Sequence, residues 1–265
     1  MTSSPSLGLR VLIVAAGLVV AGCATTQSSP SPRDPWERVN RSTYAFNDSI
    51  DRAVLKPVAK GYRRYVPQFM RTGVTNFLTN LAYPTTLINN LLQLKFKDAF
   101  SDTGRLLLNT TLGLGGLLDP ATDAGLARNN EDFGQTLGRW GVPAGPYFVI
   151  PLLGPSTLRD TPTLYADYLT DARHYIGDSK IGFAFAGISI IDRRARLLPA
   201  EQAIEGAYDT YALIRNAYLD RREYLVRDGK VPEESLDEDL WFEEAEAESG
   251  PPPAEATGAG ESPPE

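Results

Sequence analysis

An apolar stripe marks the first strongly patterned segment of the chain. Its members recur at spacings of three and four, at Trp36, Val39, Thr43, Phe46, Ile50 and Val54. That spacing predicts an amphipathic helix of about five turns. Asp34 is expected to cap this helix, with Pro35 at its first position and Glu37 at its third. Pro57 is expected to end it, because the residue before a proline avoids the helical region.

Similar patterns predict further helices along the body. We expect one at residues 58–65, ended by Pro67, and one in the segment from Asn76 towards Pro84. A helix over 85–94 would be capped by Thr85 and Thr86, and another runs along 99–110. The last is expected at 199–228, with Gly229 as its C-terminal cap. Between them, glycines break up residues 104–154, where turns and short helices are expected. Only Tyr147–Ile150 has the composition of a strand, and Ser156 is expected to cap a helix. The pattern indicates an all-α single domain without internal repeats.

The N-terminus has the organisation of a secretory signal. Arg10 is the only charged residue among the first 22, and an apolar run at 11–20 follows it. The run is too short to span a bilayer, which needs about 20 residues. Residues 20–23, Val-Ala-Gly-Cys, resemble a bacterial lipobox, so residues 1–22 are interpreted as a signal peptide and Cys23 as the lipidated residue. Ala24 follows, which favours the outer membrane over retention at the inner membrane.

Charge divides the mature chain into a basic body and an acidic tail. The net charge is −7, but residues 233–265 hold twelve acidic side chains and no Lys or Arg, leaving 21 acidic against 26 basic residues elsewhere. We expect a polar linker over 23–33, one domain over 34–230, and a disordered acidic, proline-rich tail over 231–265. The small basic excess and the export signal together argue against nucleic-acid binding.

Residues that could support catalysis or metal binding are few. His174 is the only histidine, and no G-x-S-x-G motif is present to expose a nucleophilic serine. The single cysteine is assigned to lipid, and no H-E-x-x-H motif occurs. We therefore expect no enzyme activity, no metal and no cofactor beyond the covalent lipid on Cys23.

Two features favour contact with lipid. Residues 181–191 are an apolar block followed at once by Arg193, Arg194 and Arg196, which are candidate contacts for phosphate headgroups. A buried core helix with a solvated basic end explains the same pattern equally well. The second feature is the glycine-rich apolar segment 113–118, for which a plain loop is the alternative.

Seven separated blocks give the body a resemblance to the MlaA/VacJ lipoproteins of the maintenance-of-lipid-asymmetry system. The match runs in order from about residue 34 to 228. The blocks are DPWERVNR at 34–41 with FN at 46–47, PVA at 57–59, NF and NL at 76–81, NNLLQ at 89–93, NTTLG at 109–113, EDFGQTLG at 131–138, and the segment from Gly141 through Asp160. The acidic tail lies outside this resemblance.

The resemblance implies a ring of amphipathic helices embedded in the periplasm-facing leaflet of the outer membrane around a polar channel. It also implies association with a trimeric porin and transfer of mislocalised outer-leaflet phospholipid to a periplasmic carrier linked to an ABC transporter. Gly113, Gly115 and Gly116 are a candidate hinge or gate for such a channel. A structural lipoprotein that braces a porin or an assembly complex is the first alternative, and a periplasmic lipid hydrolase is the second.

Overall fold

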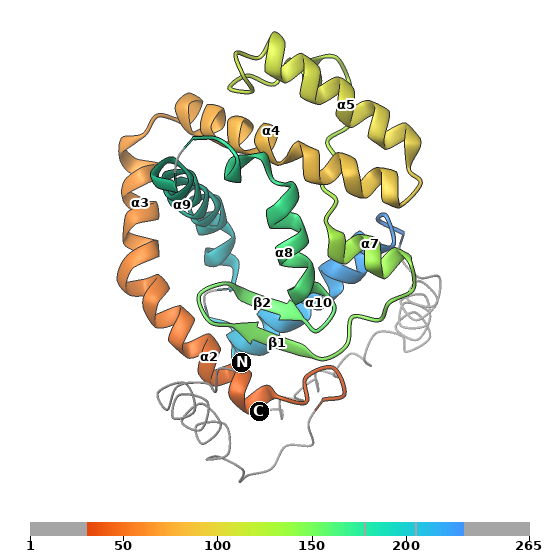
Figure 1. The fold of residues 1–265 in the computed structure, drawn as a ribbon. Helices are drawn as coiled ribbons and strands as arrows, with labels where there is room; N and C mark the ends of the chain where they lie inside the picture. The colour runs from red at the N-terminus through yellow and green to blue at the C-terminus, as the bar shows by residue number, and fades with distance from the viewer. Residues whose placement is uncertain (1–30, 178, 205, 231–265) are drawn as a thin grey trace, which may run out of the picture.

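The structure is a computed structural model that describes residues 31–177, 179–204 and 206–230 (Figure 1). The lipidation prediction at Cys23 and the tail prediction at 231–265 lie outside these residues. The elements are α2 (Glu37–Ile50), the π-helix η1 (Asp51–Leu55), α3 (Lys56–Tyr65), α4 (Gln68–Leu92), α5 (Phe96–Thr111), α6 (Pro120–Asp123), α7 (Phe133–Arg139), β1 (Tyr147–Ile150), β2 (Gly154–Thr157), α8 (Asp160–Thr170), the 3-10 helix η2 (Ala172–His174), α9 (Ser179–Ile204) and α10 (Thr210–Val226).

The helices surround a central opening (Figure 1). Helices α2 and α3 form one side, α4 crosses the adjacent side, and α8 with the β1–β2 hairpin lies opposite α3. Helix α9 packs against α3 and α4, while α7 packs against both α8 and α10. Helix α5 packs on α4 outside this ring. The expected all-α single domain is confirmed, with one small hairpin added.

The expected helix stop at Pro57 is wrong, because α2 continues through η1 into α3 without a break. Pro57 stands at the start of α3, directly after the π-helical turn. A proline lacks the N–H of an ordinary helix position and crowds the carbonyl one turn back. The wider π-turn changes the hydrogen-bond register at this point, which lets the helix pass the proline.

Asp34 does not cap α2. The cap position is Trp36, whose side chain makes no capping bond, and Asp34 is instead fully buried. Its carboxylate accepts hydrogen bonds from Asn40 Nδ2 at 2.7 Å, the Tyr211 hydroxyl at 2.6 Å and an Arg215 guanidinium N–H at 3.0 Å. One carboxylate therefore joins the start of the described chain to α10, near its end.

Two asparagines on the inner face of α2 hold the hairpin. Asn40 donates to the Tyr147 carbonyl at 3.1 Å and accepts from Val149 N–H at 2.9 Å. Seven residues on, Asn47 repeats the arrangement, donating to the Ile150 carbonyl and accepting from Leu152 N–H at 2.7 Å. This polar face lies beside the apolar stripe, whose members Trp36, Val39, Phe46 and Val54 are exposed.

Two other expected helix boundaries are wrong. Residues 68–92 form a single helix with Pro84 inside it, so Thr85 and Thr86 are buried helix residues, not caps. The last predicted helix is divided differently, because Pro199 lies inside α9 and α10 begins at Thr210. Asp209 caps α10 by accepting from Ala212 N–H, a polar signal that marks a new helix start.

The strand expected at Tyr147–Ile150 is confirmed as β1, which pairs antiparallel with β2. Ser156 lies in β2 opposite Phe148 and is not the predicted helix cap. The cap position of α8 is Arg159, whose side chain makes no capping bond, while the Thr157 hydroxyl accepts from the Asp160 N–H at the start of the helix. Gly229 follows α10 with a φ of +78°, in keeping with its expected place after the helix.

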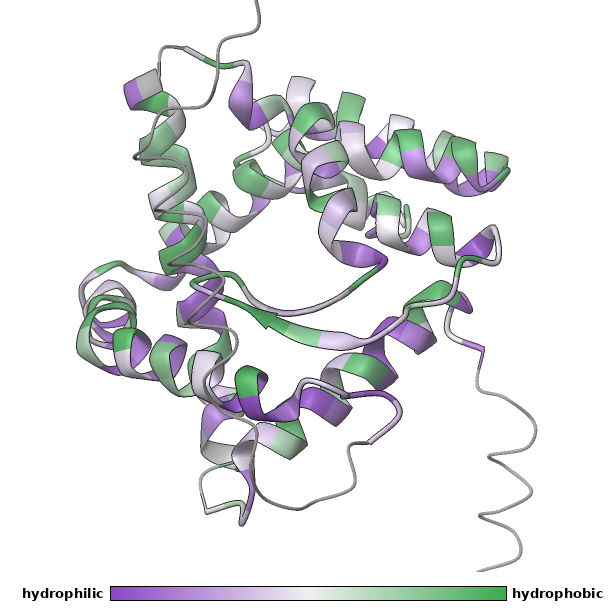
Figure 2. Cartoon of the chain, turned by 60° about the horizontal axis from the view of Figure 1, so that its bottom comes forward, coloured by the Kyte–Doolittle hydropathy of each residue, from purple (hydrophilic) through white to green (hydrophobic). Residues whose placement is uncertain are grey.

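Burial is inverted relative to a water-soluble protein. Nine of the ten largest side chains that are less than 2 % exposed are polar or charged. Large apolar side chains face outward instead, with Phe69, Phe100 and Phe183 each more than three-quarters exposed. Hydrophobic and hydrophilic residues alternate around the helices that frame the opening (Figure 2). Exposed apolar surface on this scale marks contact with a membrane or a partner.

Apolar clusters inside the molecule are small. One joins Ala59, Ala195 and Leu198, and the other joins Tyr147, Val149 and Tyr211. Within the described residues, no helix combines the length and hydrophobicity needed to cross a bilayer.

Candidate functional site

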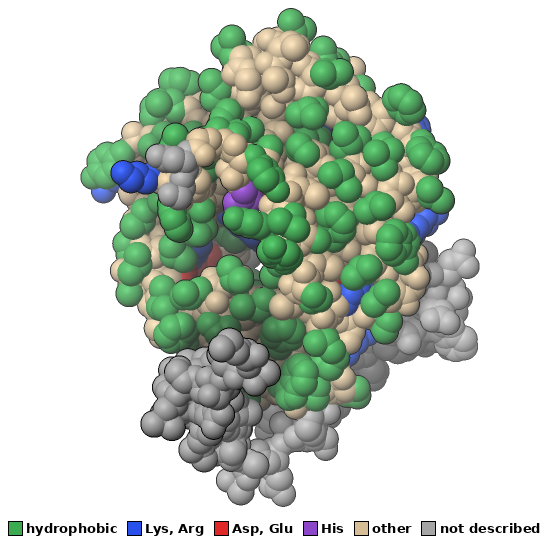
Figure 3. Space-filling view, viewed as in Figure 1, with side chains coloured by type: hydrophobic (Ala, Val, Ile, Leu, Met, Phe, Trp, Pro, Cys, Tyr) green, Lys and Arg blue, Asp and Glu red, His purple; other side chains and the backbone are tan. Residues whose placement is uncertain are grey.

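A cavity of about 360 Å³ lies beside α8. Its walls come from α4, the segment before α7, α8 and η2, and include His174. The space-filling view shows the molecule hollowed between α8 and α9, with the histidine at the edge and acidic and basic side chains inside (Figure 3). The remaining lining residues are Ala82, Thr85, Thr86, Asn130, Glu131, Asp132, Leu164, Asp167, Tyr168, Asp171 and Arg173.

Three of the four carboxylates on this wall have a cationic partner. Glu131 accepts from Lys95 Nζ at 3.0 Å, and Asp171 forms a close ion pair with Arg173. Asp132 is bound by both terminal nitrogens of Arg222, at 2.6 and 3.0 Å. Burial alone would raise the pKa of Asp132, but the Arg222 hydrogen bonds hold it below its ordinary value.

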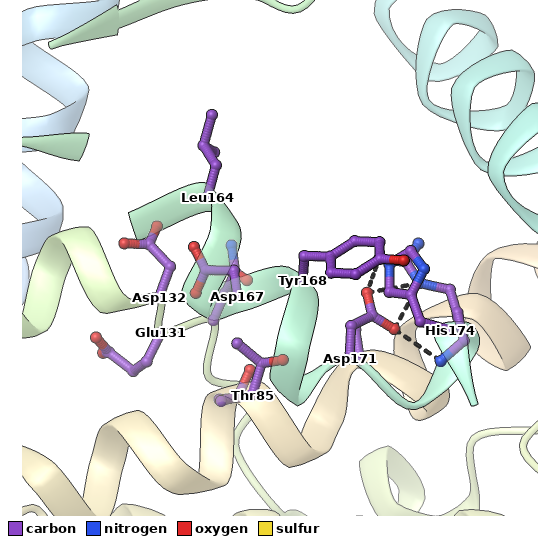
Figure 4. Close-up of a pocket in the computed structure, with 12 residues that line it drawn as sticks. Thr85, Glu131, Asp132, Leu164, Asp167, Tyr168, Asp171 and His174 are labelled. Atoms are coloured by element: carbon purple, nitrogen blue, oxygen red, sulfur yellow. Dashed lines mark hydrogen bonds and ion pairs between the residues drawn. The ribbon is translucent and has the colours of Figure 1, made fainter. Parts of the chain in front are cut away.

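The fourth carboxylate, Asp167, has no ion pair with any described residue. One oxygen accepts the Phe133 N–H at 3.0 Å, at the start of α7. Burial raises the pKa of Asp167 to about 6, and neighbouring Asp132 adds to the rise. The close-up places Asp167 on α8 within the pocket wall, between Asp132 and Tyr168 (Figure 4). Arg222 offsets part of the rise through space, but its guanidinium binds Asp132 and Asp160 and makes no ion pair with Asp167. A further cation that enters the cavity would stabilise this carboxylate.

Aromatic rings and one fixed cation form the other end of the wall. Tyr168 packs on His174 with 3.6 Å between ring centroids, and Tyr165 stacks on Tyr168 at 6.3 Å. Arg173 is anchored by Asp171 and donates to Ser189 Oγ of α9 at 3.1 Å. His174 makes no side-chain hydrogen bond to a serine or threonine whose side chain the structure describes, so the geometry of a hydrolytic triad is not assembled there.

Arg222 of α10 fixes the position of this wall. Besides Asp132 it binds Asp160 at 2.9 Å, and Arg159 binds Asp160 from the other side at 2.7 Å. The helix approach depends on Gly134, because a Cβ there would lie 2.5 Å from the Arg222 guanidinium. Gly138 is equally restricted, since its Cβ would lie 2.7 Å from Val226. The small-residue spacing of 134 and 138 therefore serves packing of α7 against α10.

The candidate gate glycines lie elsewhere, in the turn after α5. They are not among the residues that line the cavity. A Cβ on Gly113 would lie 2.3 Å from the Asn109 carbonyl oxygen, and one on Gly116, at φ +98°, would lie 2.6 Å from Asn80. Gly115 has a φ of +74° and open space around it. Two of the three glycines are therefore required by packing against α5 and α4.

The three candidate headgroup arginines lie on α9 with different surroundings. Arg194 binds both oxygens of Asp51 at 2.7 Å and also Glu201 at 2.9 Å. Arg196 pairs with buried Asp192 at 3.1 Å. Arg193 is exposed and has no ion pair with any described residue. Of these three arginines, Arg193 is therefore the one without a carboxylate partner among the described residues.

No group of three or more His, Cys, Asp or Glu side chains in the described segments is arranged to hold a metal ion. The sequence did not indicate that Asp167, Thr86 or Tyr168 would line a cavity, because they come from two helices far apart in the chain. A signal existed only for the segment before α7, because EDFGQTLG at 131–138 stood out as a block.

Comparison with known proteins gives the family. The model of the MlaA lipoprotein family matches residues 32–225. The chain belongs to the MlaA lipoprotein family. The intermembrane phospholipid transport system lipoprotein MlaA of Escherichia coli K12 is 35% identical over 236 residues, covering 86% of this chain and 93% of that protein. The MlaA protein of Haemophilus influenzae is 34% identical and covers 85% and 94%.

The fold of the MlaA family also matches in three dimensions. A solved structure that describes the structural basis for maintenance of bacterial outer membrane lipid asymmetry has a TM-score of 0.66 to this chain. It is 36% identical in sequence, and the match covers 73% of this chain and 98% of that one. The resemblance inferred from the seven sequence blocks is thereby confirmed.

Proposed function

We propose that this MlaA-family chain is an outer-membrane lipoprotein that removes mislocalised phospholipid from the outer leaflet and passes it to a periplasmic carrier. The observation that carries the proposal is a polar cavity of about 360 Å³ inside a ring whose outward faces are apolar. Relatives named as lipoproteins of an intermembrane phospholipid transport system support it.

The physical reason is the divided chemistry of a phospholipid. A charged headgroup in hydrocarbon costs several kcal/mol or more, so its path needs polar walls. Acyl tails need no such path and can remain against apolar surface. A ring with polar side chains inside and apolar side chains outside offers both environments in one leaflet, without a helix that spans the bilayer. The role needs no enzyme activity, metal or cofactor from the protein.

The anchor and the partners complete the proposal. Acyl chains on Cys23 would hold the body in the periplasm-facing leaflet, since two or more chains anchor stably. A trimeric porin and a periplasmic carrier of an ABC-transporter-linked pathway are the proposed partners. Gly113, Gly115 and Gly116 remain proposed as a hinge, and Arg193 is the proposed headgroup contact of the α9 arginines, because Arg194 and Arg196 already bind carboxylates.

The test is the amount of phosphatidylethanolamine exposed on the cell surface, labelled with an amine reagent that does not cross the outer membrane. Wild-type cells, a null strain and a Cys23→Ala strain are compared. Increased labelling in both mutants supports transport by an anchored protein. Unchanged labelling in the null strain, with the porin complex still assembled in wild type and lost in the null, would favour the bracing role instead.

A hydrolase is tested in the same cells. His174 carries the only imidazole of the chain, so lipid hydrolysis through a histidine base would be abolished in His174→Ala. Transport predicts that His174→Ala leaves free fatty acid and lysophospholipid at wild-type levels. A fall in both products specific to this variant would favour the hydrolase.

A further inference from the structure

The cavity keeps two polar groups that the protein itself does not satisfy. The first is Asp167, whose carboxylate accepts one backbone N–H and has no ion pair with the described residues. Its three neighbours on the wall, Glu131, Asp132 and Asp171, are each neutralised by a Lys or Arg. Asp167 is therefore the one carboxylate of this wall that has no ion pair among the described residues.

The second group is the hydroxyl of Thr86. This side chain is only 7% exposed, lines the cavity and makes no hydrogen bond to any described residue. The adjacent Thr85 differs, because its hydroxyl accepts from Thr170 Oγ at 2.9 Å. Its Oγ1 is not among the buried side-chain atoms that lack a partner in the described part of the chain, so the hydroxyl itself reaches the cavity space. Thr86 therefore offers an open hydrogen-bonding position on the α4 wall.

The mouth of the cavity combines apolar and aromatic surface. Leu164 and Tyr168, one turn apart on α8, are both about half exposed and line the opening on either side of Asp167 (Figure 4). His174 packs on the Tyr168 ring, so the ring contributes apolar surface to the rim, which suits the glycerol and acyl part of a lipid. Carboxylate and hydroxyl inside this rim together match an alkylammonium group.

We propose that this cavity is a headgroup subsite that binds the ammonium of an ethanolamine phospholipid, with Asp167 as the charge partner and Thr86 as the hydroxyl partner. This inference rests on the proposed transport function and names its preferred substrate. A phospholipid whose headgroup has no amine, such as phosphatidylglycerol, brings a phosphate charge to an unpaired carboxylate and gains no compensating ion pair. The subsite therefore selects zwitterionic over anionic lipid.

The experiment measures lipid selection by the full-length lipidated protein. Purified protein is equilibrated with mixed micelles of equimolar phosphatidylethanolamine and phosphatidylglycerol, recovered by affinity capture, and its non-covalent lipid is quantified by mass spectrometry. Wild type is expected to enrich phosphatidylethanolamine about tenfold over the micelle ratio, as for a charge-assisted hydrogen bond. Asp167→Asn should return the bound lipid to the micelle ratio, while its amide oxygen can still accept the Phe133 N–H.

Matched controls separate the subsite from general effects. Asp220→Asn removes the same charge at an exposed position of α10, where the side chain is 70% exposed, and should keep the wild-type ratio. Thr86→Val keeps the shape but removes the hydroxyl and should lower the enrichment several-fold, whereas Thr86→Ser restores it. If Asp167→Asn fails to fold, the Thr86 pair decides the question.

The outcomes distinguish this inference from the function on which it rests. Wild-type protein that binds both lipids at the micelle ratio, or Asp167→Asn protein that keeps the enrichment, overturns the subsite and leaves transport intact. Wild-type protein that binds neither lipid overturns the proposed function together with the subsite. The subsite and the transport function are both supported if Asp167→Asn and Thr86→Val lose the enrichment of phosphatidylethanolamine while Asp220→Asn keeps it.

Discussion

Replacing Asp34 with asparagine tests whether one buried carboxylate joins the two ends of the ring. Asparagine keeps an oxygen for Asn40 but presents its amide to the Tyr211 hydroxyl and to Arg215, which now bind the carboxylate at 2.6 and 3.0 Å. Removing one partner of a buried ion pair costs about 3–5 kcal/mol. Arg215 also lies 3.7 Å from Glu37, so the lower end, about 3 kcal/mol, is expected.

For a domain of this size, that loss corresponds to a Tm lowered by about 6–12 °C. The measurement is thermal unfolding in detergent, followed by circular dichroism at one scan rate. Asp220→Asn is the control, because its carboxylate is 70% exposed and 3.9 Å from Arg33, and should change stability by less than about 0.5 kcal/mol. Combining Asp34→Asn with Tyr211→Phe should cost less than the sum of the two single changes. A loss below about 1 kcal/mol for Asp34→Asn would refute the reasoning.

Three further predictions address the cavity wall, the turn after α5 and the hairpin. Asp167→Asn should stabilise the fold by about 1 kcal/mol at pH 8 after discounting for exposure. The gain should fade as pH falls through 6 towards 4 in a pH series of unfolding curves, because the pKa near 6 means that the native carboxyl binds its proton first. Gly113→Ala should lower the free energy of unfolding by about 2 kcal/mol or more, because its Cβ would meet the Asn109 carbonyl. The control Gly182→Ala, in α9, has open space around its Cβ and should be neutral or stabilising. Thermal melting curves of the two variants, recorded under the same conditions, test this difference. Asn47→Ala removes two bonds to the β1–β2 turn and should accelerate amide exchange there, and unchanged exchange would show that the turn is held by other contacts.

The sequence was sufficient to locate most helices and the strand at Tyr147–Ile150. Periodicity succeeds where a helix has one apolar and one polar face, as α2, α3 and α5 do, whichever face is buried. The same periodicity contains no information about which face is inside. The stripe through Trp36 and Phe46 looks like a core face in the sequence and lies outside in the structure, while Asn40 and Asn47 are the residues that pack inward.

Helix ends were predicted less well, and the failures share a cause. Local rules treat a proline as a stop, yet Pro57 follows a π-turn and Pro84 and Pro199 lie inside helices. Asp34 has the position of a cap and is drawn instead into a bond network with α10, more than 170 residues away. Tertiary contacts of this range cannot be read from a local window.

The cavity could be predicted only in outline. Family resemblance implied a polar channel, and the block at 131–138 supplied Glu131 and Asp132. Asp167 could not be singled out, because many acidic residues occur in the chain and its distinction is the missing partner. That property depends on where Arg222 and Lys95 reach, and both bind other carboxylates.

The inverted burial has a consequence for how this fold is stabilised. Its interior clusters of apolar side chains are small, so little of the hydrophobic free energy comes from packing between helices. Under the proposed function, that free energy comes instead from contact between the outward apolar faces and lipid. Ion pairs such as Arg222–Asp132 and Arg105–Asp119 then determine which helices meet, because an unpaired charge in this interior costs more than the pair gains. If the proposed location is correct, lipid contact supplies the driving force and the polar network supplies the geometry, and the inner wall can keep one carboxylate unpaired without losing the fold.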